Sequence, residues 1–141
     1  VGSIPRKAKG YRGETFIMIF QNLHRYALYA AIVFIPILYA DAFAAFFRGG
    51  KLGIGVGSLV LLMNATLLGL YTFGCHSLRH AVGGFLDRFS GRPLRRNLYR
   101  CVSCFNRKHM VWAWLSLFWV AFSDIYVRMC SMGTWSDLRI F

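Results

Sequence analysis

Cysteine and histidine residues gather in one short stretch of this sequence. Three of the four cysteines and three of the four histidines fall between positions 75 and 109. His76 and His80 are four residues apart, so on a helix they would share one face and could offer ring nitrogens to one metal. Cys101 and Cys104 form a C-x-x-C motif, whose spacing lets two thiolates grip one ion. Two cysteines and two histidines match the ligand count of a Rieske-type [2Fe–2S] centre, which the inventory therefore predicts.

The same residues allow other arrangements. Cys75 and His109 are alternative metal ligands, because they lie in the same stretch. A b-type haem held by two axial histidines is a second arrangement. His76 or His80 could then pair with His109 or with a histidine of another chain, and His24 could also serve. In the third arrangement these side chains bind nothing.

A second set of residues could form a quinone site. Ser77, Arg79, Trp112 and Trp114 bring a hydroxyl, a guanidinium and two indole rings to the same edge of the expected membrane region. Such donors could hold the carbonyl groups of a quinone, and the rings would form an apolar wall. The alternative is that the tryptophans belong to the aromatic belt of the membrane interface and that Arg79 only sets the topology.

A third set lies within an apolar helix. Asp124 and Arg128 are four residues apart and can form an ion pair, with Ser123 and Tyr126 nearby. Charged side chains inside a membrane usually face the protein interior. The set therefore predicts either a proton path or a structural ion pair near the outer interface. A small transporter that works through Asp124 and Arg128 is a rival function of another class.

The composition is that of a membrane protein. Of the 141 residues, 57% are apolar and only 16% are charged, whereas soluble domains have about 25% charged residues. The net charge of +12 lies in the flanks and in one loop between apolar runs, which is typical of membrane topology. The basic loop contains no recognisable nucleic-acid-binding module, so we expect the lipid bilayer, and no nucleic acid, as a partner.

The apolar runs predict an all-α membrane protein that forms a single domain over residues 1–141. The expected spans are 26–47, 54–80 and 109–130, with a basic loop between the second and the third. Residues 14–25 could form a separate entry helix at the headgroup level. Pro36 should kink the first span, Gly83-Gly84 should end the second, and Asn106 should cap the third.

The distribution of charge predicts the orientation. The N-terminal tail and residues 79–108 are strongly basic, whereas the turn at 48–51 carries two charges. By the positive-inside rule, the N-terminus and the basic loop are cytoplasmic and the C-terminus lies outside. Residues 1–13 are basic and polar, so no signal peptide is expected there. The cysteine and histidine stretch is therefore expected at the cytoplasmic edge of the membrane.

Two stretches resemble a known family. CHSLRHAVGG at 75–84 and NRKHMVWAWLSLFWVAFSDIYVRMCSMG at 106–133 are similar to the membrane-anchor subunit of bacterial succinate dehydrogenase, complex II. The likeness is to the haem-free class with a membrane-embedded Rieske-type cluster. It covers about residues 70–141, and the first seventy residues match only in hydropathy. Leu78 stands where relatives can carry a further cysteine, which keeps Cys75 among the candidate ligands.

The resemblance implies a division of labour within an enzyme of a bacterial inner or plasma membrane. Partner flavoprotein and iron–sulfur subunits would carry flavin and further clusters and would oxidise succinate. This chain, without flavin of its own, would anchor them and help pass electrons to quinone. Three helices are few to enclose a cofactor, so a second membrane subunit is expected. The rival within the same family is a structural anchor that holds no cofactor.

Overall fold

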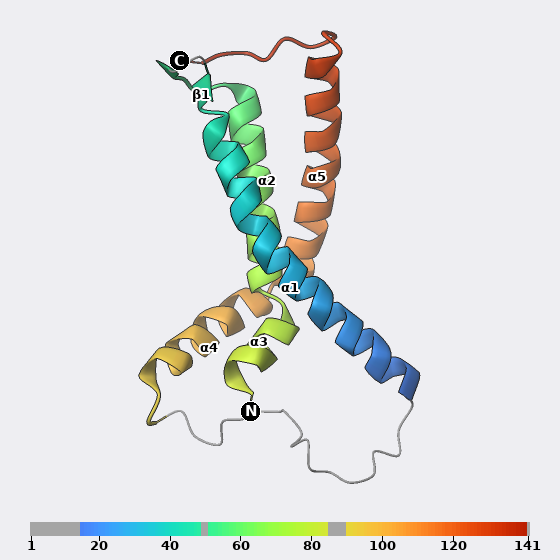
Figure 1. The fold of residues 1–141 in the computed structure, drawn as a ribbon, viewed down its shortest axis with the longest axis vertical. Coiled ribbons are helices and arrows are strands. Elements are labelled where there is room, and N and C mark those ends of the chain that lie inside the picture. Colours follow the sequence, from blue (N-terminus) through green and yellow to red (C-terminus); the bar gives the residue numbers. More distant parts are fainter. Residues whose placement is uncertain (1–14, 49–50, 85–89, 141) are drawn as a thin grey trace.

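The structure is a computed structural model that describes residues 15–48, 51–84 and 90–140. These residues form helices and one small hairpin (Figure 1). The elements are α1 (Thr15–Ala44), β1 (Phe47–Arg48), β2 (Lys51–Leu52), α2 (Val56–Phe73), α3 (His76–Gly83), α4 (Pro93–Asn106) and α5 (His109–Ser131).

Three of the helices are long and apolar enough to cross a membrane. Their candidate spans are Asn22–Ala44 in α1, Val56–Phe73 in α2 and His109–Ser131 in α5. α2 packs against both α1 and α5. The all-α fold with three spans is thus confirmed. Of the entry segment expected at 14–25, residues 15–25 are helical, but they are continuous with the first span, because α1 runs without a break from Thr15 and Pro36 does not end it. Residue 14 lies outside the described residues, and the headgroup level of this segment stays a prediction.

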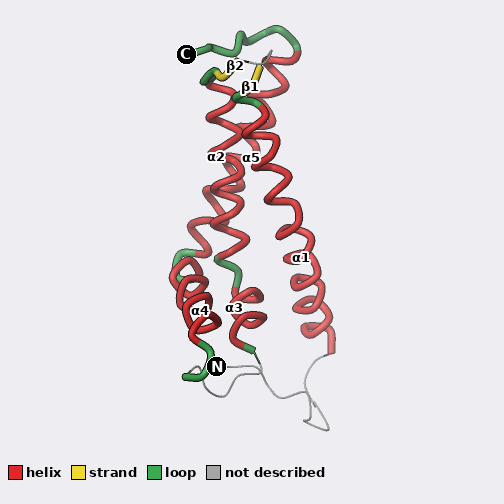
Figure 2. Tube along the Cα trace, turned by 60° about the vertical axis from the view of Figure 1, so that its left-hand side comes forward, coloured by secondary structure: helices red, strands yellow, loops and turns green. Residues whose placement is uncertain are grey.

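The molecule has two ends of different character. The first turns of α1 and α5 lie with α3 and α4 at one end, which we call the basic end (Figures 1 and 2). The β1–β2 hairpin and the segment 132–140 lie at the other, the hairpin end. The start of α1 and the basic loop therefore share one end, as the charge pattern predicts. The side of the membrane that this end faces stays a prediction.

The second span is shorter than predicted. The sequence predicts one helix over 54–80, but α2 ends at Phe73 and α3 begins at His76. Between them, Cys75 has an extended backbone with φ −65° and ψ 135°. The carboxamide of Asn106 donates a hydrogen bond to the carbonyl oxygen of Gly74 over 2.8 Å, so the end of α4 holds this break in place. The predicted stop after Gly83 is confirmed.

The predicted cap of the third span is wrong for the same reason. Asn106 is the last residue of α4, and its side chain serves the α2–α3 break. Lys108 stands at the N-cap position of α5 instead, without a side-chain cap hydrogen bond.

Small residues line the contacts between the spans. Ala42 of α1 and Ala65 of α2 are fully buried, and Ser116 and Ser123 of α5 are nearly so. Small side chains let helix backbones approach closely, which is how helices associate in lipid. Polar contacts add to this packing, because the indole of Trp119 donates to the carbonyl of Val60 over 3.1 Å.

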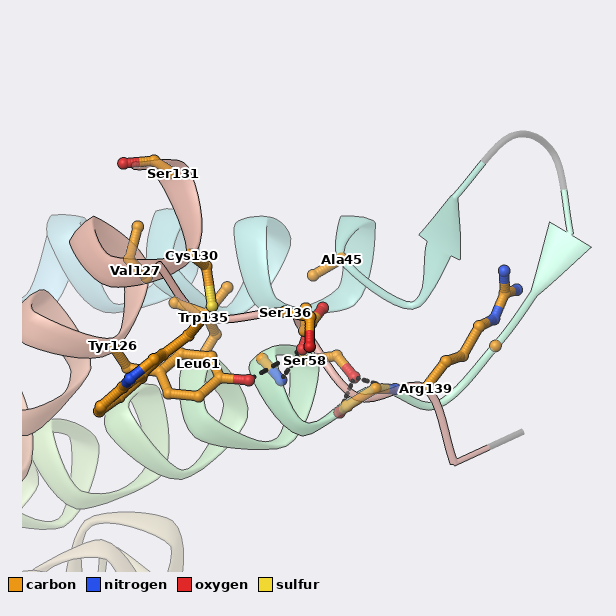
Figure 3. A pocket seen from close by; sticks show the side chains of 14 residues that line it. Ala45, Ser58, Leu61, Tyr126, Val127, Cys130, Ser131, Trp135, Ser136 and Arg139 are labelled. Atoms are coloured by element: carbon orange, nitrogen blue, oxygen red, sulfur yellow. Dashed lines mark hydrogen bonds between the residues drawn. The ribbon is translucent and has the colours of Figure 1, made fainter. Parts of the chain in front are cut away.

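The C-terminal segment folds back onto the hairpin end. The carboxylate of Asp137 accepts hydrogen bonds from the amide of Gly57, at 2.8 Å, and from the hydroxyl of Tyr126, at 2.9 Å. It thereby joins the start of α2 to the last turns of α5. A pocket of about 590 Å³ lies between these elements, with Cys130 and Trp135 among its lining residues (Figure 3).

Candidate metal centre

Three potential metal ligands meet at the basic end. His24 comes from α1, Cys75 from the break between α2 and α3, and His76 from the first position of α3. One ligand atom from each lies within 4.8 Å of the other two. The Nε2 atom of His24 is 3.1 Å from the Sγ atom of Cys75, and the rings of His24 and His76 stack at 5.3 Å with planes 7° apart. We call these three residues the His–Cys–His group.

The local fold explains why these side chains meet. A helix that continued through residues 74–76 would turn Cys75 and His76 about 100° apart around its axis. The extended backbone of Cys75 breaks that relation, so its buried thiol and the imidazole of the next residue can both approach α1. The break held by Asn106 is thus the feature that builds the group.

The protonation of His76 suits metal binding. Partial burial, followed by the charges of His24 and His80, holds the pKa of His76 below its usual value. A neutral imidazole has a free ring nitrogen, which is the form that ligates metals. The thiol of Cys75 is 3% exposed, and a metal ion would bind it as the thiolate.

The other two histidines lie around the group. The ring of His80 meets the ring of His76 edge-on at 6.5 Å. His109, the first residue of α5, stacks on Tyr71 of α2 at 4.8 Å. The buried Nδ1 atom of His109 has no hydrogen-bond partner. All four histidines of the chain therefore belong to the basic end, and one of them keeps an unsatisfied nitrogen.

The structure does not bring together the four residues that the sequence combined. Cys101 and Cys104 are exposed on α4, and within the described part of the chain they are not members of any group of three close ligands. His80 is likewise outside the His–Cys–His group. The role of each residue in metal binding stays a prediction, but the geometry favours His24 and Cys75 as the companions of His76.

The group matches part of a Rieske-type ligand set. Such a centre takes two histidines on one iron and two cysteines on the other. The His–Cys–His group supplies both histidines and one cysteine, and it contains no second thiol. His24 and His76 are not placed as a pair of axial haem ligands, because their stacked rings, 5.3 Å apart, leave no room for a macrocycle between them. The other predicted histidine pairs for haem stay predictions.

The predicted quinone residues occupy different surroundings. Ser77 is buried, and Trp114 is exposed and stacks on Phe118. The Nε1 atom of Trp112 is buried without a hydrogen-bond partner. Arg79 has an unpartnered buried Nε atom as well, but its guanidinium lies 5.0 Å from the ring centre of Tyr99 on α4. Arg79 therefore faces α4, whereas Trp112 lies one helical turn beyond His109.

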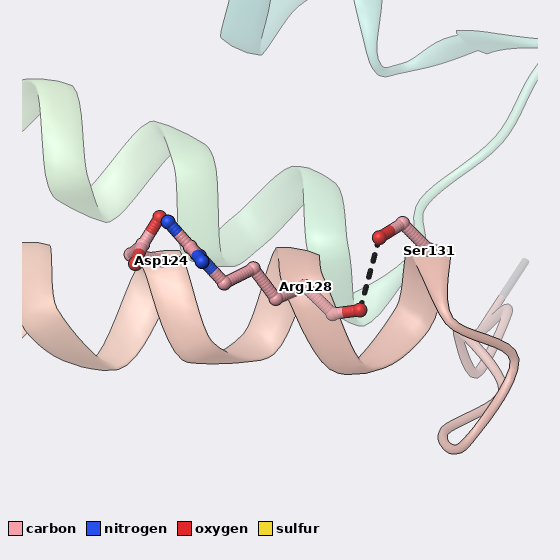
Figure 4. Close-up of polar contacts among 3 residues, drawn as sticks. All are labelled: Asp124, Arg128 and Ser131. Carbon is pink, nitrogen blue, oxygen red and sulfur yellow. Dashed lines mark hydrogen bonds and ion pairs between the residues drawn. The ribbon is translucent and has the colours of Figure 1, made fainter.

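The predicted set on α5 divides between two environments. Arg128 and Asp124 form an ion pair of 3.0 Å whose side chains are 73% and 62% exposed (Figure 4). Tyr126 instead bonds Asp137, and Ser123 bonds the carbonyl of Trp119. The polar side chains of the set therefore do not converge on one point: Tyr126 faces the pocket at the hairpin end, whereas Asp124 and Arg128 are exposed.

From the sequence, His24 was expected only as a possible haem ligand and was not among the residues predicted to bind the iron–sulfur cluster. The position of His24 in the sequence could have indicated this role, because His24 lies at the start of the first span and hence at the basic end. Its distance from Cys75 along the sequence hid the contact. The hydrogen bond from Asn106 to Gly74 could not be read from any motif.

Comparisons with known proteins identify relatives over most of the chain. Residues 2–133 match the family described as "Actinobacterial succinate dehydrogenase subunit SdhC". A chain of a solved structure titled "Mycobacterium smegmatis Sdh1 complex in the apo form" is 39% identical, with a TM-score of 0.82. That alignment covers 96% of the present chain and 52% of the matched chain, so the present chain spans about half of its length. The curated proteins searched contain no match. The likeness thus extends well into the first seventy residues, beyond the part that the sequence motifs indicated.

Proposed function

Because this chain belongs to the family of the actinobacterial succinate dehydrogenase subunit SdhC, we propose that it anchors a succinate:quinone oxidoreductase in the bacterial membrane and helps pass electrons to quinone. The three span-forming helices support the anchoring role. The observation that carries the redox role is the His–Cys–His group at the basic end.

The proposed partners are the flavoprotein and iron–sulfur subunits of the enzyme. They would dock at the basic end, where α4 and its flanking residues are rich in exposed cationic side chains, Arg92 and Lys108 among them. Further membrane helices would cover the spans, because large apolar side chains such as Phe34, Phe118 and Ile125 are exposed on them. These helices belong to a second membrane subunit or to further sequence of the same protein.

We assign the metal centre to His24, Cys75 and His76, and we propose that it is a Rieske-type cluster. Its second cysteine would come from outside the His–Cys–His group, with Cys101 and Cys104 as the candidates in this chain. When bound, histidine-ligated iron supplies a one-electron centre with a higher potential than an all-thiolate cluster. The chain's own contribution is to orient the imidazoles of His24 and His76 and to exclude water from the thiol of Cys75, which is buried.

The quinone site would lie beside the start of α5. His109 and Trp112 are three residues apart on this helix, so they share a face, and each has a buried ring nitrogen without a partner. Leaving a buried donor unpaired costs about 1–3 kcal/mol, and a quinone carbonyl oxygen would accept a hydrogen bond from the indole of Trp112. Ser77 and Trp114 remain proposed members of the wall.

Metal analysis and electron paramagnetic resonance of the purified complex test the assignment. We expect iron beyond the content of the soluble subunits and a Rieske-type signal, without a haem absorption band. Cys75→Ser and His24→Ala should abolish the signal. Cys130→Ser, at the hairpin end, and His80→Ala are the matched controls and should keep it.

Two results would reject parts of this assignment. A signal that persists in Cys75→Ser but disappears in Cys101→Ser or Cys104→Ser would restore the ligand set expected from the motifs. A complex that oxidises succinate and reduces quinone with no iron beyond that of the soluble subunits would leave this chain as an anchor without a cofactor.

A further inference from the structure

A basic pocket lies between α3 and α4, away from the His–Cys–His group. Its volume is about 630 Å³, and Arg79, Arg100 and Arg107 contribute to its lining. None of the described residues that line it is acidic, and three of them carry guanidinium groups, so their surface is positive. We call it the arginine pocket.

Two polar atoms of the lining residues are buried without a partner. The Nε atom of Arg79 and the Oγ atom of Ser103, both from lining residues, are buried without a hydrogen-bond partner. Guanidinium groups bind phosphate oxygens with charge-assisted hydrogen bonds in a fixed geometry. The chemistry of the arginine pocket therefore fits a phosphate group.

An apolar pocket adjoins the arginine pocket. It has a volume of about 470 Å³, and side chains of α1, α2, α3 and α4 line it, Phe73, Leu78, Leu98 and Phe105 among them. Cys101 lines both pockets, so the two meet at this residue of α4. A ligand that occupied both would need an anionic head and a hydrocarbon tail.

The walls of the two pockets are held together. The side chain of Arg95 on α4 donates hydrogen bonds to the carbonyl oxygen of Val82 at 2.7 and 2.9 Å and to that of Gly84 at 3.2 Å. These carbonyls belong to the end of α3, so Arg95 fastens α4 to α3. These hydrogen bonds fix the spacing between the two helices.

Both pockets are lined in part by α3 or α4, which adjoin the ends of the candidate membrane spans. α3 follows the span α2 after two residues, and α4 precedes the span α5 by two residues. α4 is amphipathic, with Leu94 and Leu98 exposed and arginines on its other side, which is typical of a helix that lies in the lipid–water interface. Figure 1 shows α3 and α4 beside the lower end of the spans.

We propose that the arginine pocket and the apolar pocket together bind one anionic phospholipid, with its phosphate at Arg100 and Arg107 and an acyl chain along Leu98. Basic pockets at the membrane edge are known binding sites for anionic lipid headgroups. An acidic protein surface would use the arginines but not the apolar pocket. A quinone headgroup is neutral and would not need three guanidinium groups.

The test measures the lipid that stays with the purified complex. The complex is washed in neutral detergent, and its phospholipids are extracted and quantified by mass spectrometry. Anionic phospholipid should remain at about one molecule per copy of this chain. The double variant Arg100→Gln/Arg107→Gln should retain at least about tenfold less, since it loses two charge-assisted contacts. Arg96→Gln, exposed on the same helix but outside both pockets, is the control and should retain the wild-type amount.

A second pair of variants tests the tail. Leu98→Gln, in the apolar pocket, should lower the retained lipid about fivefold. Leu94→Gln, exposed outside the pocket, should not. The metal signal and the content of soluble subunits report whether each variant is assembled.

Four results would overturn the proposal. The double variant could retain as much anionic lipid as the wild type. Inorganic phosphate could displace the lipid, which would make the site one for a free anion. A short-chain quinone could displace it, which would make the pockets a quinone site. The double variant could lose its soluble subunits while keeping its lipid, which would make the arginine pocket a docking surface for protein.

Discussion

Replacing Gly74 with alanine tests whether the break between α2 and α3 builds the metal group. A methyl group at this position would come within 2.8 Å of the carbonyl oxygen of Leu70 and within 3.2 Å of that of Phe105. Both are backbone atoms, which cannot swing aside as a long side chain does. The last turn of α2 and the end of α4 must therefore shift, although the 2.8 Å hydrogen bond from Asn106 to Gly74 holds the two together.

The size of the effect follows from two opposed terms. Crowding of this kind costs about 1–3 kcal/mol, whereas replacing glycine by alanine restricts the unfolded chain and returns about 0.4–1 kcal/mol. Since φ at Gly74 is −82°, alanine can adopt the backbone conformation and no strain is added there. We expect a net loss of about 1–2 kcal/mol of unfolding free energy.

A matched control lies in the same helix. At Gly69 the nearest atom to an added methyl group would be the hydroxyl oxygen of Tyr39, at 3.8 Å, which is an ordinary contact. Gly69→Ala should therefore be neutral or stabilise the protein by up to about 1 kcal/mol.

The assay is an unfolding titration of the purified protein in mixed micelles, followed by the metal signal of the folded complex. Gly74→Ala should unfold at a lower fraction of denaturing detergent and should also weaken or broaden the signal, because Cys75 is the next residue. Equal unfolding curves for Gly74→Ala and Gly69→Ala would refute the steric argument. A destabilised Gly74→Ala with an unchanged signal would refute the link between the break and the metal group.

Three further substitutions have defined outcomes. Asp137→Ala should lower the unfolding free energy by about 2–4 kcal/mol in the same titration, because it removes the acceptor of two hydrogen bonds. An unfolding curve of this variant equal to that of the wild type would show that the contacts of Asp137 add no stability. Asp124→Asn should slightly reduce the amount of assembled protein in membranes, because it breaks the exposed ion pair with Arg128, which is worth about 0.2–1 kcal/mol. Asp124→Asn/Arg128→Gln should restore the amount if the pair is structural. Trp112→Phe should lower quinone reduction about tenfold, because it removes one hydrogen-bond donor, while succinate oxidation with an artificial acceptor is unchanged. Trp114→Phe is the control. Equal effects of the two substitutions would argue against a role for the indole nitrogen of Trp112.

Several features of the fold could be predicted because they depend on local composition. Apolar runs of sufficient length predict the three spans, since a bilayer accepts a chain only as a helix with its backbone groups satisfied. The stop after Gly83 follows from the low helix propensity of two consecutive glycines. Charge distribution predicts that the start of α1 and the basic loop share one end, and the structure places them together.

The break at residues 74 and 75 could not be predicted, because the apolar run continues across it. At the break, the end of α4 contacts the end of α2. The carboxamide of Asn106 donates a hydrogen bond to the carbonyl oxygen of Gly74, 32 residues earlier in the chain. The same contact removes Asn106 from its predicted capping role. Asn106 could have capped the next helix, but its side chain instead makes a long-range hydrogen bond to Gly74.

By itself, the sequence determined which residues are available for chemistry and that they collect at one end of a three-helix membrane protein, because side-chain type, hydropathy and charge are local properties. Only the tertiary structure decided the grouping. It joined His24, 51 residues away, to Cys75, set Cys101 apart on α4 and opened two pockets that meet at that residue. These contacts depend on how α1, α3 and α4 are arranged at the basic end. The spacing of residues within one segment does not predict how that segment packs against another.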